Sequence, residues 1–227
     1  MTEYRAPPLA VLFDVGNTLL EERRFDLEAG IGAVVDDSRS VEALAGAFRT
    51  EAADRHQRHE EMLLAQWLVD RVPSLARAPL ADVEDRIWAA VVTLVPMPLI
   101  EGVLARLSDD GVVLAALSNA AFSGRVLRTE LARFHLADRL RFVLSSADVG
   151  CRKPASEIFR MAVGHMGVAP EHTWFVGDTV EEDITGALAA GLRPVLLSTD
   201  MTPRLPRPSI PVARDWAEFM ALYIQTA

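Results

Sequence analysis

The 227-residue sequence lacks the features that mark several large classes of protein. Its single cysteine excludes a disulfide within the chain, and with it a small scaffold held by disulfides. No apolar run approaches the ~20 residues that a membrane-spanning helix needs. The formal net charge of −9 argues against a nucleic-acid interface, because such an interface needs a basic surface. Residues 1–8 are polar and resemble no signal peptide, so we expect a soluble cytoplasmic protein without membrane or nucleic-acid partners.

The first strong pattern present is at residues 9–19, Leu-Ala-Val-Leu-Phe-Asp-Val-Gly-Asn-Thr-Leu. Five apolar residues end at Asp14, which is typical of a buried strand in a parallel sheet. Asp14 would then lie at the carboxyl end of the strand, where open α/β sheets bind their ligands. Gly16, Asn17 and Thr18 predict a tight turn whose backbone N–H groups could hold an anion. Taken alone, the stretch favours an ordinary strand end with an Asx turn over a ligand site.

The pattern that follows indicates two parts in the chain. Residues 25–95 show apolar positions at helical spacing and no evident strand, so we expect an inserted, all-helical cap domain over residues 21–95. The remainder, residues 1–20 and 96–227, would form the core domain. Its predicted strands are residues 112–117, 141–144, 173–176 and 194–197, and its predicted helices are residues 99–109, 120–134, 155–166, 181–190 and 215–224. This alternation predicts a doubly wound α/β fold with a parallel, Rossmann-like sheet.

Polar residues follow the later strands as well. Ser118 and Asn119 end the second strand, where a hydroxyl and a helix N-terminus could hold a phosphate oxygen. Lys153 follows the third strand and can present a positive charge to a phosphate or a carboxylate. Asp178 ends the fourth strand, with Asp183 shortly after it. Carboxylates and backbone oxygens at one edge of a sheet are hard ligands that suit Mg²⁺.

The chain resembles the haloacid dehalogenase-like (HAD) hydrolase superfamily in the order of four polar residues, Asp14, Ser118, Lys153 and Asp178. The resemblance covers the whole chain and is strongest at residues 13–19 and 175–187. The helical insertion resembles the small α-helical, C1-type cap of the phosphatase-type branch. The resemblance implies a sheet of order 3-2-1-4-5 with the first strand at its centre.

The resemblance also implies a role for each site residue. Asp14 would attack phosphorus and form an aspartyl-phosphate, while Ser118 binds the transferring phosphoryl group and Lys153 balances the charge. The implied phosphate-binding set comprises Gly16, Asn17, Thr18, Ser118, Asn119 and Lys153. The implied Mg²⁺ ligands are Asp14, Asp178 and the carbonyl of Gly16, with Asp183 supporting them. The implied partner is a small phosphorylated substrate, and both a monomer and a homodimer remain open.

One position departs from the phosphatase pattern. The family's phosphatases usually carry a second aspartate two residues after the nucleophile, where this chain has Gly16. That aspartate protonates the leaving group and later activates water, and such acid–base help is worth ~10²–10⁴ in rate. Three interpretations follow: a Mg²⁺-dependent phosphatase that favours good leaving groups, a binding or regulatory protein without turnover, and a dehalogenase-type hydrolase. Asp178 and Asp183 favour the metal-dependent version over the dehalogenase.

Residues of the predicted cap bear on substrate recognition. His56 and His59 could supply the missing acid, but their polar surroundings in the sequence indicate a solvated helix face. Trp67 and Trp88 are expected in the core of the cap. Arg152 could attract anions or face solvent.

Overall fold

The protein is described here from a computed structural model that covers residues 4, 6–200 and 202–226. Its main sheet has six strands in the order β5-β4-β1-β6-β7-β8, with every neighbouring pair parallel. The strands are β5 (Val143–Ser145), β4 (Val113–Ser118), β1 (Ala10–Phe13), β6 (Thr173–Gly177), β7 (Arg193–Leu197) and β8 (Val212–Ala213). The first five confirm the predicted 3-2-1-4-5 order and the doubly wound α/β class. The two-residue edge strand β8 was not predicted.

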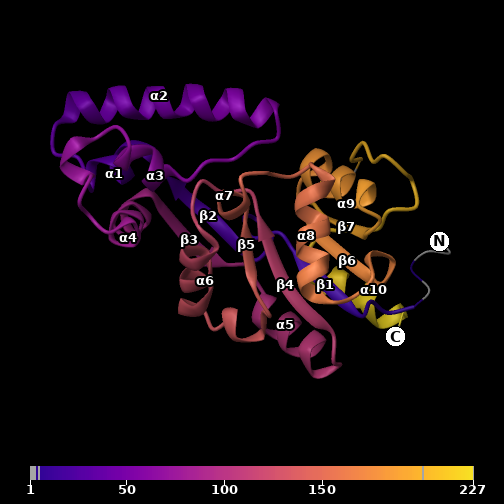
Figure 1. The fold of residues 1–227 in the computed structure, drawn as a ribbon. Helices are drawn as coiled ribbons and strands as arrows, with labels where there is room; N and C mark the ends of the chain where they lie inside the picture. The colour runs from indigo at the N-terminus through magenta and orange to yellow at the C-terminus, as the bar shows by residue number, and fades with distance from the viewer. Residues whose placement is uncertain (1–3, 5, 201, 227) are drawn as a thin grey trace.

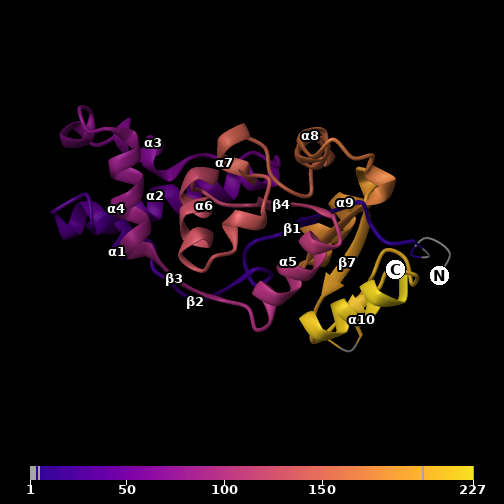
Figure 2. The ribbon, with the colours of Figure 1, turned by 90° about the horizontal axis from the view of Figure 1, so that it is seen from below.

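Helices cover both faces of the sheet, as Figures 1 and 2 show. Side chains alternate along β1, so that Val11 and Phe13 face α5 (Ile100–Asp109) and α10 (Trp216–Thr226). Ala10 and Leu12 face the opposite side, against α8 (Ser156–Met166) and α9 (Gly186–Ala189). All four β1 residues are fully buried, which explains the unbroken apolar run in the sequence.

A cluster of helices lies at one end of the molecule, away from the sheet (Figure 1). It contains α1 (Leu27–Gly32), α2 (Ser38–Gln57), α3 (Leu64–Val69), the short 3₁₀ helix η1 (Pro73–Leu75) and α4 (Leu80–Val91). Asp26 caps α1 and Asp37 caps α2, each accepting a backbone N–H bond from the first turn. The cluster buries its own apolar core, which includes Trp67 as predicted. No helix of the described residues is long and apolar enough to cross a membrane.

The prediction that residues 21–95 contain no strand was wrong. Strands β2 (Leu20–Phe25) and β3 (Val92–Pro96) pair antiparallel and join the helix cluster to the sheet (Figure 1). Four of the six residues of β2 are charged, and its last four residues are exposed. Backbone hydrogen bonds hold this ribbon together, and it buries little apolar surface. Its sequence therefore needs no alternation of apolar and polar residues, which is the pattern that predicts a strand.

The structure also corrects element boundaries in the core. The helix predicted from residue 120 begins at Gly124 as α6 (Gly124–Arg133), with Ser123 as its N-cap. The helix predicted over 181–190 begins with a π-helical segment, η4 (Val180–Thr185), which continues into α9. Three short elements were not predicted: α7 (Ser146–Val149) and the 3₁₀ helices η2 (Ala137–Arg139) and η3 (Pro170–His172).

Candidate active site

The loop after β1 places Asp14 at the carboxyl edge of the sheet. The Asp14 N–H donates to Val176 O of the neighbouring strand at 2.9 Å, so its backbone still belongs to the sheet. The N–H groups of Leu19 and Leu20 both donate to Val15 O, which closes a tight turn. Asn17, in this turn, has a φ of 52°, a left-handed conformation that asparagine tolerates better than most residues. The side chain of Asp14 is only 9% exposed.

Lys153 joins two carboxylates at this edge. Its Nζ donates to Asp14 Oδ1 and to Asp183 Oδ1, each at 2.6 Å, and its side chain is buried. The Asn119 side chain fixes the Lys153 backbone, since Asn119 Oδ1 accepts from Lys153 N at 2.8 Å and Asn119 Nδ2 donates to Lys153 O at 3.0 Å. The predicted strand-end residues Asn119 and Lys153 are therefore one connected unit with Asp14.

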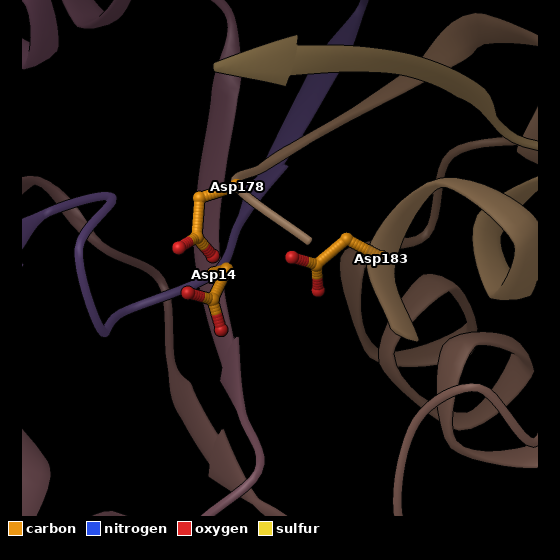
Figure 3. Close-up of side chains that lie close together, drawn as sticks. All are labelled: Asp14, Asp178 and Asp183. Carbon is orange, nitrogen blue, oxygen red and sulfur yellow. The ribbon is translucent and has the colours of Figure 1, made fainter. Parts of the chain in front are cut away.

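Asp178 and Asp183 complete an acidic group around Asp14. Figure 3 shows Asp14 and Asp178 side by side, with the carboxylate of Asp183 facing them. One oxygen from each of the three carboxylates lies within 4.8 Å of the other two. Asp183 also accepts the Thr179 N–H through Oδ2 at 3.0 Å, so both of its oxygens are held. Asp183 thus orients the site, whereas Asp178 lies at the surface of the cavity.

The charges of this group are not balanced by the protein. When all three carboxylates are ionised, the single Lys153 ammonium leaves two negative charges uncompensated. Burial and the nearby Asp183 raise the pKa of Asp14 to about 7, against the opposing effect of Lys153. Burial and Asp183 also raise the pKa of Asp178. Burial lowers the pKa of Lys153, but Asp14 and Asp183 outweigh it and hold that pKa above its ordinary value.

These features fit a divalent cation. The donors are carboxylate oxygens, which hard cations such as Mg²⁺ prefer, and a double positive charge would balance the two excess negative charges. A cation would also lower the pKa values that burial has raised, because it stabilises the ionised carboxylates. The cluster can therefore hold a divalent metal ion.

A polar cavity of about 170 Å³ opens beside this group. Its lining includes most of the predicted site residues: Asp14, Gly16, Asn17, Ser118, Asn119, Lys153, Asp178 and Asp183. Thr18 is absent from this lining, because its side chain is fully buried and its carbonyl accepts the Trp216 indole N–H at 3.1 Å. Thr18 therefore supports the turn from behind, and the anion-binding role expected of its backbone N–H stays a prediction.

The family model for haloacid dehalogenase-like hydrolases matches residues 8–191. The chain belongs to the HAD-like hydrolase family. A glyceraldehyde 3-phosphate phosphatase of Methanopyrus kandleri is 32% identical to this hydrolase over 86% of this chain and 88% of its own length. A ribulose-1,5-bisphosphate 5-phosphatase of Halopiger xanaduensis is 32% identical over 82% of this chain and 83% of its own length. The crystal structure of a HAD phosphatase from Thermococcus onnurineus shares the fold, with a TM-score of 0.63 and 21% identity. The match covers 94% of this chain and 96% of that one.

This HAD-like hydrolase has a second polar group that the sequence analysis did not assemble. Glu61 is buried, and it accepts from Ser146 Oγ at 3.2 Å and pairs with His56 Nε2 at 3.3 Å and with Arg152 Nη1 at 3.4 Å. Arg152 also pairs with Glu182 at 3.1 Å, and Glu182 accepts from Asn119 Nδ2 at 2.9 Å. His56 contacts this group while its side chain stays 39% exposed, as the expected solvated face implies. The sequence signal that could have indicated this group is Glu61, a charged residue directly before the apolar residues 62–64.

Proposed function

We propose that this chain is a Mg²⁺-dependent phosphatase that hydrolyses a small phosphorylated metabolite through an aspartyl-phosphate on Asp14. The observation that carries the proposal is the ion pair of Lys153 with Asp14 and Asp183 at the carboxyl edge of the sheet. It holds one oxygen of Asp14 and leaves Oδ2 for attack on an ester. The names of the two curated relatives support phosphate esters as the substrate class.

The residues of the chain account for each step of this reaction. Asp14 Oδ2 attacks phosphorus, the bond from phosphorus to the ester oxygen breaks, and the leaving oxygen departs with the electron pair. Water then attacks phosphorus, the bond to Asp14 breaks, and phosphate leaves while a proton from the water passes to solvent. Ser118 and Lys153, which line the cavity, would hold the phosphoryl oxygens through both steps. Phosphoryl transfer depends chiefly on such positioning and charge balance.

A bound Mg²⁺ would supply electrostatic stabilisation of the phosphoryl oxygens. Asp14, Asp178 and the carbonyl of Gly16 would hold it, with Asp183 keeping Lys153 and the nearby backbone in place. The three clustered carboxylates, which Lys153 alone cannot neutralise when all are ionised, support this assignment.

Gly16 leaves the site without the usual carboxylic acid two residues after the nucleophile. A Cβ added at Gly16 would meet no atom within 4 Å, so the place of that side chain is open space. No proton donor on this turn can assist the leaving group. The site would therefore favour esters whose leaving oxygen is stable as an anion.

We also propose that residues 21–95 act as a cap on a core made of residues 1–20 and 96–227. The apolar core of the helix cluster, to which residues outside 21–95 contribute one buried side chain, Phe122, supports this division. So does the connection through the β2–β3 ribbon. Substrate would bind between the two parts, next to Asp14.

The test is hydrolysis of acetyl phosphate by wild type and Asp14→Asn, each with Mg²⁺ and with EDTA. We expect turnover that needs Mg²⁺ and disappears in Asp14→Asn. Wild-type activity equal to that of the mutant would exclude this phosphatase mechanism and favour a binding protein. Halide release from a haloacid in EDTA would instead indicate the dehalogenase-type reaction.

A further inference from the structure

A larger cavity, of about 270 Å³, adjoins the polar cavity at Asp14. The two cavities share Gly16, Ser118 and Asn119 in their linings. The larger one extends from there between helices α2 and α4, strand β3 and the segment that follows β4. A phosphate held at Asp14 would therefore direct its leaving group into this larger cavity.

Aromatic and aliphatic side chains form most of its lining, and they come from distant parts of the sequence. The principal ones are Phe48, Trp88, Leu94, Phe122 and Leu127. The rings of Trp88 and Phe122 lie edge to face, with centroids 4.9 Å apart. The Trp88 N–H donates to Glu130 at 3.2 Å, and Glu130 does not line the cavity, so Trp88 contributes its ring and not its polar atom.

The volume and polarity of the cavity restrict the group that it can accept. An apolar cavity of roughly 150 Å³ is enough to hold benzene, so this one has room for a substituted or fused aromatic ring. Hydroxyl groups placed against the apolar lining would lose water without gaining hydrogen bonds, which is unfavourable. The lining thus disfavours a polyhydroxylated leaving group.

The charged residues of the lining disfavour an anionic leaving group. Arg152 is the one arginine or lysine among the lining residues, and it already pairs with Glu61 and Glu182. Glu22 adds a further carboxylate to the lining. A negatively charged leaving group would meet more carboxylates than cations here.

We propose that the substrates of this site are phosphate monoesters of uncharged aromatic alcohols, chiefly phenols. Two independent observations meet in this class: the aromatic cavity accepts the ring, and the missing acid at Gly16 favours a leaving oxygen that is stable without a proton. The bond from phosphorus to the phenolic oxygen breaks, and the phenolate leaves with the electron pair and takes a proton from water afterwards. The inference rests on the proposed phosphatase function.

The test compares esters that differ in shape but not in the acidity of the leaving alcohol. Phenyl phosphate and hexafluoroisopropyl phosphate are such a pair, and 1-naphthyl phosphate adds a larger ring. We expect kcat/KM at least tenfold higher for the aryl esters than for the fluoroalkyl ester. Equal or lower values for the aryl esters, with acetyl phosphate still hydrolysed through Asp14, would overturn this inference and leave the phosphatase function standing. Absence of turnover with every ester would overturn both.

Substitutions in the cavity test the same point. Trp88→Ala removes an aromatic wall, and Ala52→Phe fills the cavity from α2. Both are expected to lower the ratio of kcat/KM for the aryl ester to that for the fluoroalkyl ester at least fivefold. Ala52→Phe still tests the proposal if Trp88→Ala fails to fold. Trp67→Phe is the control, because Trp67 lies in the core of the helix cluster outside the cavity. An unchanged ratio in Ala52→Phe would contradict the assignment.

Discussion

Gly177 lies directly against the carboxylate of Asp183. A Cβ added at Gly177 would lie 2.5 Å from Asp183 Cγ, a distance that real Cβ atoms do not reach. We expect Gly177→Ala to displace Asp183, to weaken its bond with Lys153 and to lower kcat at least tenfold, with an overpacking cost of about 1–3 kcal/mol. Activity and thermal melting of Gly164→Ala provide the control, because Gly164 is an exposed helical position with nothing within 4 Å. Wild-type kcat in Gly177→Ala would show that Asp183 has no role.

Removal of the Lys153 charge should destabilise the fold. In Lys153→Met, Asp14 and Asp183 would remain buried without their ammonium partner, at an expected cost of about 3–5 kcal/mol in the free energy of unfolding. Chemical denaturation in EDTA measures this cost. Arg106→Met, which breaks an exposed ion pair with Asp110, should cost far less, because water screens that pair. Similar costs for the two variants would argue against a tightly coupled buried cluster.

The raised pKa of Asp14 predicts how metal binding depends on pH. The Asp14 pKa is about 7 in the metal-free fold against an ordinary value of 3.8. Between these values the folded protein holds a proton that the unfolded chain has lost, so this group's contribution to stability falls as pH rises. A metal ion must displace that proton, so stabilisation by Mg²⁺ should grow from about pH 5 to about pH 8.

Melting temperatures with Mg²⁺ and with EDTA across this range measure the effect. Asp14→Asn has no such proton to displace, so its response to Mg²⁺ should be smaller and should depend less on pH. Equal stabilisation of the wild type at both ends of the range would contradict the assignment of Asp14 as a ligand.

Restoring an acid at position 16 should broaden the activity. The open space beside Gly16 admits Gly16→Asp without a steric conflict. A carboxylic acid there could protonate the leaving oxygen, so we expect a rise of ~10²–10⁴ in kcat/KM for alkyl phosphates and a much smaller rise for aryl phosphates. Gly16→Asn has nearly the same shape without the acid, and it should show no such rise. Equal rates for the two variants would show that the missing acid is not the limitation.

The positions of the core strands and of most site residues could be predicted from the sequence. Strands β1, β4, β6 and β7 are almost wholly buried, so each appears as an apolar run. Asp14, Ser118 and Asp178 mark where three of these runs end. Parallel strands present their carboxyl ends at one edge of the sheet, so the topology implies that these three residues lie close together. The burial of the Thr18 side chain could not be predicted, since a turn shows which residues it contains but not which side chains face inward.

The β2–β3 ribbon and the larger cavity could not be predicted in the same way. The ribbon is held by backbone pairing, which does not depend on the identity of its charged side chains. The cavity brings Trp88 of α4 beside Phe122 of the loop after β4, and helical periodicity does not say how the helix cluster sits on the core. The contact of His56 with Glu61 could not be predicted either, because Glu61 lies beyond the end of the helix that carries His56.

The central claim is that Asp14 becomes phosphorylated during turnover. Rapid acid quenching of the enzyme with Mg²⁺ and phosphate-labelled phenyl phosphate, followed by peptide mapping, tests it directly. The account predicts a label on the peptide that contains Asp14, its loss on treatment with hydroxylamine, as an acyl phosphate requires, and no label in Asp14→Asn. Turnover without a labelled Asp14 peptide, or with the label on another residue, would contradict it.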